Sequence, residues 1–116
     1  VDSNTRGASM KNLVVGAGTL YPPNSLHPDV TNVGKIKSLI PTHDDIYFWI
    51  MALANNTKIK LVKNKDVNLI AVKGTQSTGL CKKNNKNGAG MSPLDAYKIM
   101  LSNYPEVYEK IEKESF

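Results

Sequence analysis

The apolar run at residues 46–54 is the feature that most constrains the fold of this chain. Its nine residues fall well short of the roughly 20 that a membrane-spanning helix needs. Thr42 is a good N-cap in front of it, and Asp44 and Asp45 fall in the first turn, where carboxylates interact favourably with the helix dipole. Because apolar side chains cover nearly every side of the segment, the sequence predicts a buried helix over residues 42–55.

Weaker patterns predict the other elements. A short helix is expected over residues 33–40, ended by Pro41, and a C-terminal helix is expected to start at Ser92-Pro93 and to resume at Pro105. These patterns predict an α/β fold, in which a buried helix and a C-terminal helix accompany a small mixed sheet. One domain is expected over residues 1–116, with residues 1–12 as a flexible leader. The β-type runs are residues 11–15, 58–62 and 67–72, and the last two are close enough for a hairpin.

The charge of the chain restricts its partners only loosely. The net charge is +5, but the lysines are spread along the sequence and predict a solvated surface, with an anionic membrane surface or a phosphorylated ligand as alternatives. We expect no nucleic-acid partner. A single cysteine, Cys81, excludes an internal disulfide, and with only two histidines no zinc-type ligand cluster can be drawn. Two other classes stay open: a small basic binding module and an RNase-like toxin domain, for which a single arginine is a poor supply of catalytic cations.

Three stretches in order carry a family resemblance. They are GAGTLYPPNSLHPDV at 16–30, PTHDDIYFWIMALANNTKIKLVKN at 41–64 and NYPEVYEKIEK at 103–113. They are similar to the C-terminal, acceptor-side half of bacterial glycosyltransferases of the GT-A fold that build capsular or lipopolysaccharide sugars. That family has a GG-x-LYPP … LH-x-DV segment followed by ADD-x-WFWAMAL-x-NGTKI. Here Ala17 replaces the second glycine, and His43 replaces a small residue.

The resemblance implies a function in surface polysaccharide synthesis. The full enzyme would move a sugar from a nucleotide-sugar donor to a saccharide or lipid-linked acceptor, in the cytoplasm or at the inner face of the membrane. Its nucleotide-sugar half would hold a divalent cation, Mn or Mg, at an Asp-x-Asp motif, and no such motif occurs in this sequence. We therefore expect the isolated chain to be inactive.

The resemblance also suggests which residues form the site. Asp45 is the candidate general base for the acceptor hydroxyl, with Asp44 as its orienting partner or as an acceptor ligand. On spacing alone, both carboxylates could instead be capping residues. His27 is either a loop histidine bonded to backbone or a contact to acceptor or leaving group. Phe48 and Trp49 fit a core better than a sugar platform. The candidate acceptor- or donor-binding residues are Gly16, Gly18, Tyr21, His27, His43 and Gln76.

Overall fold

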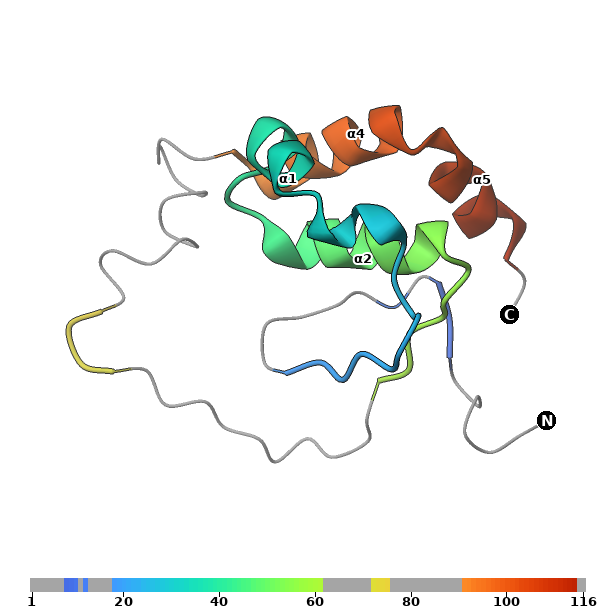
Figure 1. Ribbon diagram of the computed structural model, residues 1–116, viewed down its shortest axis with the longest axis horizontal. Coiled ribbons are helices and arrows are strands. Elements are labelled where there is room, and N and C mark those ends of the chain that lie inside the picture. The colour runs from blue at the N-terminus through green and yellow to red at the C-terminus, as the bar shows by residue number, and fades with distance from the viewer. Residues whose placement is uncertain (1–7, 11, 13–17, 62–71, 76–90, 115–116) are drawn as a thin grey trace.

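The protein is described by a computed structural model over residues 8–10, 12, 18–61, 72–75 and 91–114. In the described part, α2 lies along one side and contacts η1, α4 and α5, while α1 packs against α4 (Figure 1). α2 is therefore the helix against which η1, α4 and α5 all pack. The described residues form a 3₁₀ helix, η1 (Pro28–Thr31), and four α-helices, α1 (Val33–Leu39), α2 (Asp44–Ala54), α4 (Pro93–Asn103) and α5 (Pro105–Lys113).

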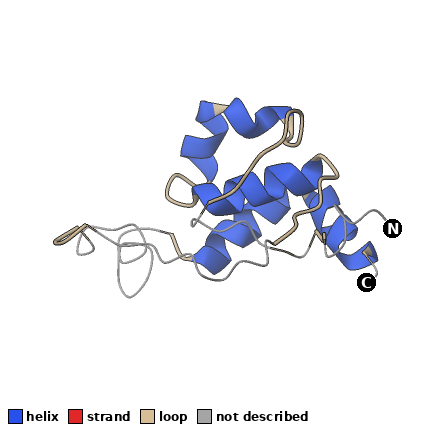
Figure 2. Ribbon diagram, turned by 90° about the horizontal axis from the view of Figure 1, so that it is seen from below, coloured by secondary structure: helices blue, strands red, loops and turns tan. Residues whose placement is uncertain are grey.

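The predicted α/β fold is wrong for this part of the chain. Its secondary structure is helical, with no strand or sheet among the described residues (Figure 2). In the predicted strand 58–62, one isolated antiparallel bridge joins Ile59 to Ser9, and Leu61 is exposed. A β-type run becomes a strand only when a neighbouring segment pairs along it, and one bridge is all the pairing that the described residues show. The predicted strands 11–15 and 67–72 lie outside the described residues, except for positions 12 and 72.

The predicted buried helix is confirmed as α2, but its start differs from the expected one. His43, and not Thr42, occupies the N-cap position, and its side chain makes no capping bond. Each first-turn acid instead accepts the next backbone N–H: Asp44 Oδ1 from Asp45 at 2.9 Å, and Asp45 Oδ1 from Ile46 at 2.8 Å. These donors have no partner inside the helix, so the carboxylates satisfy them in place of an N-cap side chain.

The other predicted helices form where prolines and caps marked them. α1 ends before Pro41, as expected. The Ser92 side chain caps α4 by accepting the Asp95 N–H at 3.2 Å. α4 and α5 each begin with a proline, which suits this position because the backbone N–H that proline lacks would have no partner inside the helix. None of the helices in the described ranges has the length and apolar character needed to cross a bilayer.

The hydrophobic core forms between α2 and the α4–α5 pair. Half of its members come from α2, whose residues 47 and 49–53 are buried. Trp49 stacks on Tyr97 of α4, with ring centroids 5.6 Å apart, so it is a core residue as its helical spacing indicated. The core residues are Ile40, Tyr47, Trp49, Ile50, Met51, Leu53, Ala96, Met100, Tyr104 and Val107.

The end of α2 is closed by contacts from distant segments. Lys110 of α5 donates to the carbonyl oxygens of Leu53 and Ala54, at 3.3 and 3.0 Å, and so satisfies acceptors that the helix leaves unpaired. The Trp49 indole N–H donates to the Met10 carbonyl at 3.2 Å. The segment at residues 8–10 is therefore held against the core.

Candidate functional site

The first turn of α2 carries the two candidate catalytic carboxylates. Asp44 is exposed and Asp45 is half-buried. Phe48 follows Asp44 by four residues and Asp45 by three, so its side chain lies on the same side of the helix as theirs. The Tyr21 ring lies 5.7 Å from the Phe48 ring, centroid to centroid, and is 38% exposed. The structure thus brings Tyr21 to the side of α2 that carries both carboxylates.

His43 and Gly18 each have a structural role: His43 makes a hydrogen bond, and Gly18 adopts a backbone conformation that favours glycine. His43 is buried, and its Nε2 lies 2.6 Å from the Met91 carbonyl oxygen, so the ring ties the start of α2 to the segment before α4. Gly18 has φ of +140°, which L-residues with side chains rarely adopt, and a Cβ there would meet nothing within 4 Å. Backbone conformation, and not close approach, therefore requires this glycine. Gly16 and Gln76 lie outside the described residues.

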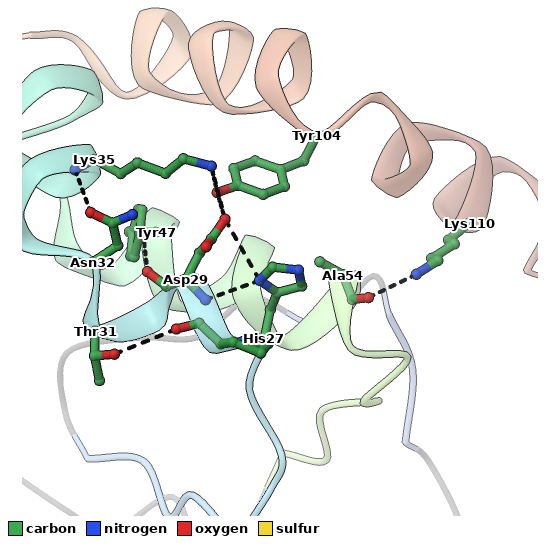
Figure 3. Close-up of polar contacts among 10 residues, drawn as sticks. His27, Asp29, Thr31, Asn32, Lys35, Tyr47, Ala54, Tyr104 and Lys110 are labelled. Carbon is green, nitrogen blue, oxygen red and sulfur yellow. Dashed lines mark hydrogen bonds and ion pairs between the residues drawn. The ribbon is translucent and has the colours of Figure 1, made fainter.

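His27 belongs to a polar group that we call the Asp29 cluster: His27, Asp29, Lys35, Tyr47 and Tyr104 (Figure 3). One carboxylate oxygen of Asp29 accepts from Lys35 Nζ at 2.8 Å and from the Tyr104 hydroxyl at 2.7 Å. The Asp29 backbone N–H donates to His27 Nδ1 at 3.1 Å, and the Tyr47 hydroxyl donates to the Asp29 carbonyl. These bonds fix the LHPDV segment to α1, α2 and the end of α4.

The electrostatics of the cluster favour a charged Asp29. Hydrogen bonds from Lys35 and then Tyr104 lower the pKa of Asp29. The bond to Asp29 in turn raises the pKa of Lys35, which also lies 5.1 Å above the Tyr104 ring centroid. Burial, and then the bond to Asp29, raises the pKa of Tyr104. The lysine and the carboxylate therefore neutralise each other, and the phenol stays protonated as their shared partner.

The contact with Asp29 defines the tautomer of His27. Because Nδ1 accepts a backbone N–H, the neutral ring carries its proton on Nε2. The same bond caps η1, whose first residue is Pro28. The bland interpretation of His27, a loop histidine bonded to backbone, agrees with this geometry.

Asp29→Asn is expected to make the free energy of unfolding less dependent on pH in the acid range. The folded-state pKa of Asp29 lies below its unfolded value of about 4, so its charge stabilises the fold above that pH, and this contribution is lost as the pH falls through the folded-state value. Urea unfolding of wild type and variant should therefore differ at pH 7 and converge towards pH 3.

Glu109→Gln is the matched control, because that carboxylate pairs with Lys113, at 4.0 Å between two exposed side chains, and with no other described residue. Its unfolding midpoint should follow that of the wild type at both pH values. A difference between wild type and Asp29→Asn that stays constant from pH 7 to pH 3 would contradict the ionic role of the cluster.

Sequence reasoning found one residue of this cluster and missed the rest of it. Only the LH-x-DV motif pointed to this region, and nothing in the sequence signals the contacts of Lys35 and Tyr104. Within the described ranges, no group of three or more His, Cys, Asp or Glu side chains could hold a metal ion. Comparison of the chain with protein-family models, curated proteins and solved structures found no match.

Proposed function

We propose that this chain is the acceptor-side part of a bacterial glycosyltransferase that acts in surface polysaccharide synthesis. One observation carries the proposal: the exposed Tyr21 ring packs on Phe48, one helical turn from Asp44 and Asp45. Aromatic faces combined with a few well-placed polar groups are typical of small-molecule sites. An aromatic platform beside carboxylates suits a saccharide, whose C–H faces stack and whose hydroxyls donate. The frame of this proposed site is helical, and not the α/β unit expected from the sequence.

The two acids each accept the next backbone N–H, but Asp44 is exposed and Asp45 is half-buried. Asp45 uses Oδ1 to accept the Ile46 N–H, and its Oδ2 is left to accept a proton. Asp44 accepts the Asp45 N–H, which helps to hold the turn that positions Asp45. We assign Asp45 as the base and Asp44 as its positioning residue or as a ligand for an acceptor hydroxyl.

In an inverting reaction, Asp45 would remove the proton of the acceptor hydroxyl as that oxygen attacks the anomeric carbon of the donor. The bond from the anomeric carbon to the donor phosphate oxygen breaks, and a nucleoside diphosphate leaves. The family resemblance places the stabilisation of that leaving group on a divalent cation, Mn or Mg, in a nucleotide-sugar half. The partners of this chain would be a nucleotide sugar and a saccharide or lipid-linked acceptor, in the cytoplasm or at the inner membrane face.

The isolated chain should bind saccharide without transferring sugar. Core oligosaccharide from bacterial lipopolysaccharide should shift the amide resonances of Tyr21, Phe48 and Asp45 in an NMR titration. Tyr21→Ala should weaken this binding on the order of tenfold, the worth of one aromatic contact. Incubation with nucleotide sugars should give no product, because positioning and leaving-group stabilisation supply most of the rate.

Tyr108→Ala is the matched control, since Tyr108 is also an exposed tyrosine but lies on α5. Binding that survives Tyr21→Ala and falls with Tyr108→Ala would place the saccharide elsewhere. Sugar transfer by the isolated chain would refute the proposal that a separate nucleotide-sugar half is needed to bind the donor and stabilise the leaving group. Saccharide binding by this chain, with no sugar transfer even when it is joined to a nucleotide-sugar half, would favour the binding-module alternative.

A further inference from the structure

A surface depression opens where α5 ends, beside the extended residues that follow α2 and the segment at residues 8–10. It has a volume of about 390 Å³ and is lined by Met10, Lys58, Lys110, Lys113 and Glu114. Figure 1 shows the residue 8–10 segment and the end of α5 on the same side of α2. The depression lies at the opposite end of α2 from Asp44 and Asp45, so it is separate from the site proposed above.

The depression carries excess positive charge. Three lysines face one carboxylate, Glu114, which leaves a net charge of +2 at neutral pH. Lys110 is fixed by its bonds to the last carbonyls of α2. Lys113 has one ion pair, with Glu109 at 4.0 Å, in which both side chains are largely exposed. In the part of the chain that the structure describes, no hydrogen bond or ion pair engages the Lys58 side chain, so its charge is available to a ligand, and the exposed Lys113–Glu109 pair is a weak competitor for the charge of Lys113.

Glu114 already occupies an anion-binding arrangement within the depression. Its two carboxylate oxygens lie 2.9 and 3.0 Å from the Met10 backbone nitrogen, and one of them accepts from Ser9 Oγ at 2.9 Å. A backbone N–H and a hydroxyl, in a depression that lysines also line, form the kind of donor set that proteins use for phosphate oxygens. Glu114 follows the last helical residue of α5, so its carboxylate can leave without unwinding the helix.

We propose that this depression binds a phosphoryl group, and that the Glu114 carboxylate occupies the place of the ligand until it is displaced. A phosphate oxygen would take over the N–H of Met10 and the hydroxyl of Ser9, while Lys58 and Lys113 close around the remaining charge. The phosphoryl group can belong to a soluble phosphorylated ligand or to a phospholipid headgroup. The proposal concerns binding by this chain alone and does not depend on the proposed sugar transfer.

The test is a titration of the 116-residue chain with inorganic pyrophosphate at low ionic strength, in which amide NMR spectra are recorded at each step. We expect shifts at Ser9, Met10 and Glu114, and binding that weakens as salt is added. Glu114→Gln removes the competing charge and keeps an acceptor oxygen, so it should tighten binding about threefold to tenfold. Lys58→Gln and Lys113→Gln should each weaken it about threefold to fivefold.

Lys98→Gln is the matched control, because it removes the same charge from an exposed position on α4, outside the depression. It should change the dissociation constant by less than about twofold. Equal weakening by Lys98→Gln and Lys58→Gln would reduce the effect to overall charge and overturn the site. The proposal also fails if neither the wild type nor Glu114→Gln binds pyrophosphate, or if Glu114→Gln binds no more tightly. The lysine variants decide the question by themselves if Glu114→Gln does not fold.

Vesicles distinguish the two sources of the phosphoryl group. Binding to phosphatidylglycerol vesicles, but not to phosphatidylcholine vesicles, that pyrophosphate competes away would assign the site to an anionic phospholipid headgroup. Pyrophosphate binding without vesicle binding would assign it to a soluble phosphorylated ligand. Vesicle binding that pyrophosphate and Lys58→Gln leave unchanged would place the membrane contact elsewhere and count against the site.

Discussion

Asp45→Asn is expected to lower sugar transfer about 10²–10⁴-fold in an enzyme that joins this segment to a nucleotide-sugar half. The amide cannot take the proton of the acceptor hydroxyl, but its oxygen can still accept the Ile46 N–H that Asp45 Oδ1 accepts now. Stability should therefore change little, since Asn suits the start of a helix nearly as well as Asp. Measuring kcat and Tm on the same preparation separates loss of the base from loss of the fold.

Asp44→Asn is the internal control for this experiment. Asp44 is more exposed and accepts the neighbouring backbone N–H, so its replacement should reduce activity less than Asp45→Asn does. If the two acids only complement the helix dipole, both variants keep full activity and melt slightly earlier. Full activity in both variants would end the catalytic assignment.

Ile50→Ala should cost about 2–5 kcal/mol of unfolding free energy, the largest effect on stability that we expect from one side chain. Ile50 is fully buried in the middle of α2, in the core shared with α4 and α5, so truncation leaves a cavity. A loss of that size is a large part of the roughly 5–15 kcal/mol that holds a small domain together. Urea unfolding followed by far-UV circular dichroism measures the change.

Leu94→Ala is the control for the core experiment, because Leu94 also lies on a helix but is 60% exposed. Its effect should stay within about 0.5 kcal/mol. If Ile50→Ala costs no more than Leu94→Ala, the packing of α2 against the α4–α5 pair is not the main source of stability.

The four α-helices among the described residues were predictable because each is marked within its own sequence, whereas the 3₁₀ helix η1 was not predicted. Pro93 and Pro105 stand at first helical positions, Pro41 follows the end of α1, and the apolar run marks α2. These signals depend on neighbours one to four residues away, so no knowledge of tertiary contacts is needed to interpret them. The N-cap of α2 was misplaced by one residue because the His43 ring bonds to Met91, 48 residues away, which no local pattern records.

The strand prediction and the Asp29 cluster show that contacts between residues far apart in the sequence could not be predicted from local patterns. Residues 58–61 have β-type composition, but a strand needs a partner, and the partner of Ile59 is Ser9, for a single bridge. The Asp29 cluster depends on Tyr104, 75 residues further along the chain. Isolated polar residues have no periodicity that would predict such a meeting. The Tyr21–Phe48 contact likewise could not be predicted from the sequence, which gave Tyr21 as a candidate binding residue and Phe48 as a core residue.

Trp49 gives this protein an intrinsic spectroscopic reporter of the state of its N-terminal segment. It is the only tryptophan in the chain, and its indole N–H is bonded to the Met10 carbonyl while its ring stacks on Tyr97. Release of residues 8–10 would expose the indole nitrogen to water and shift the emission to longer wavelength, even with α2 and α4 still packed. A change in fluorescence that precedes the loss of helical circular dichroism would therefore mark detachment of this segment as a step of its own.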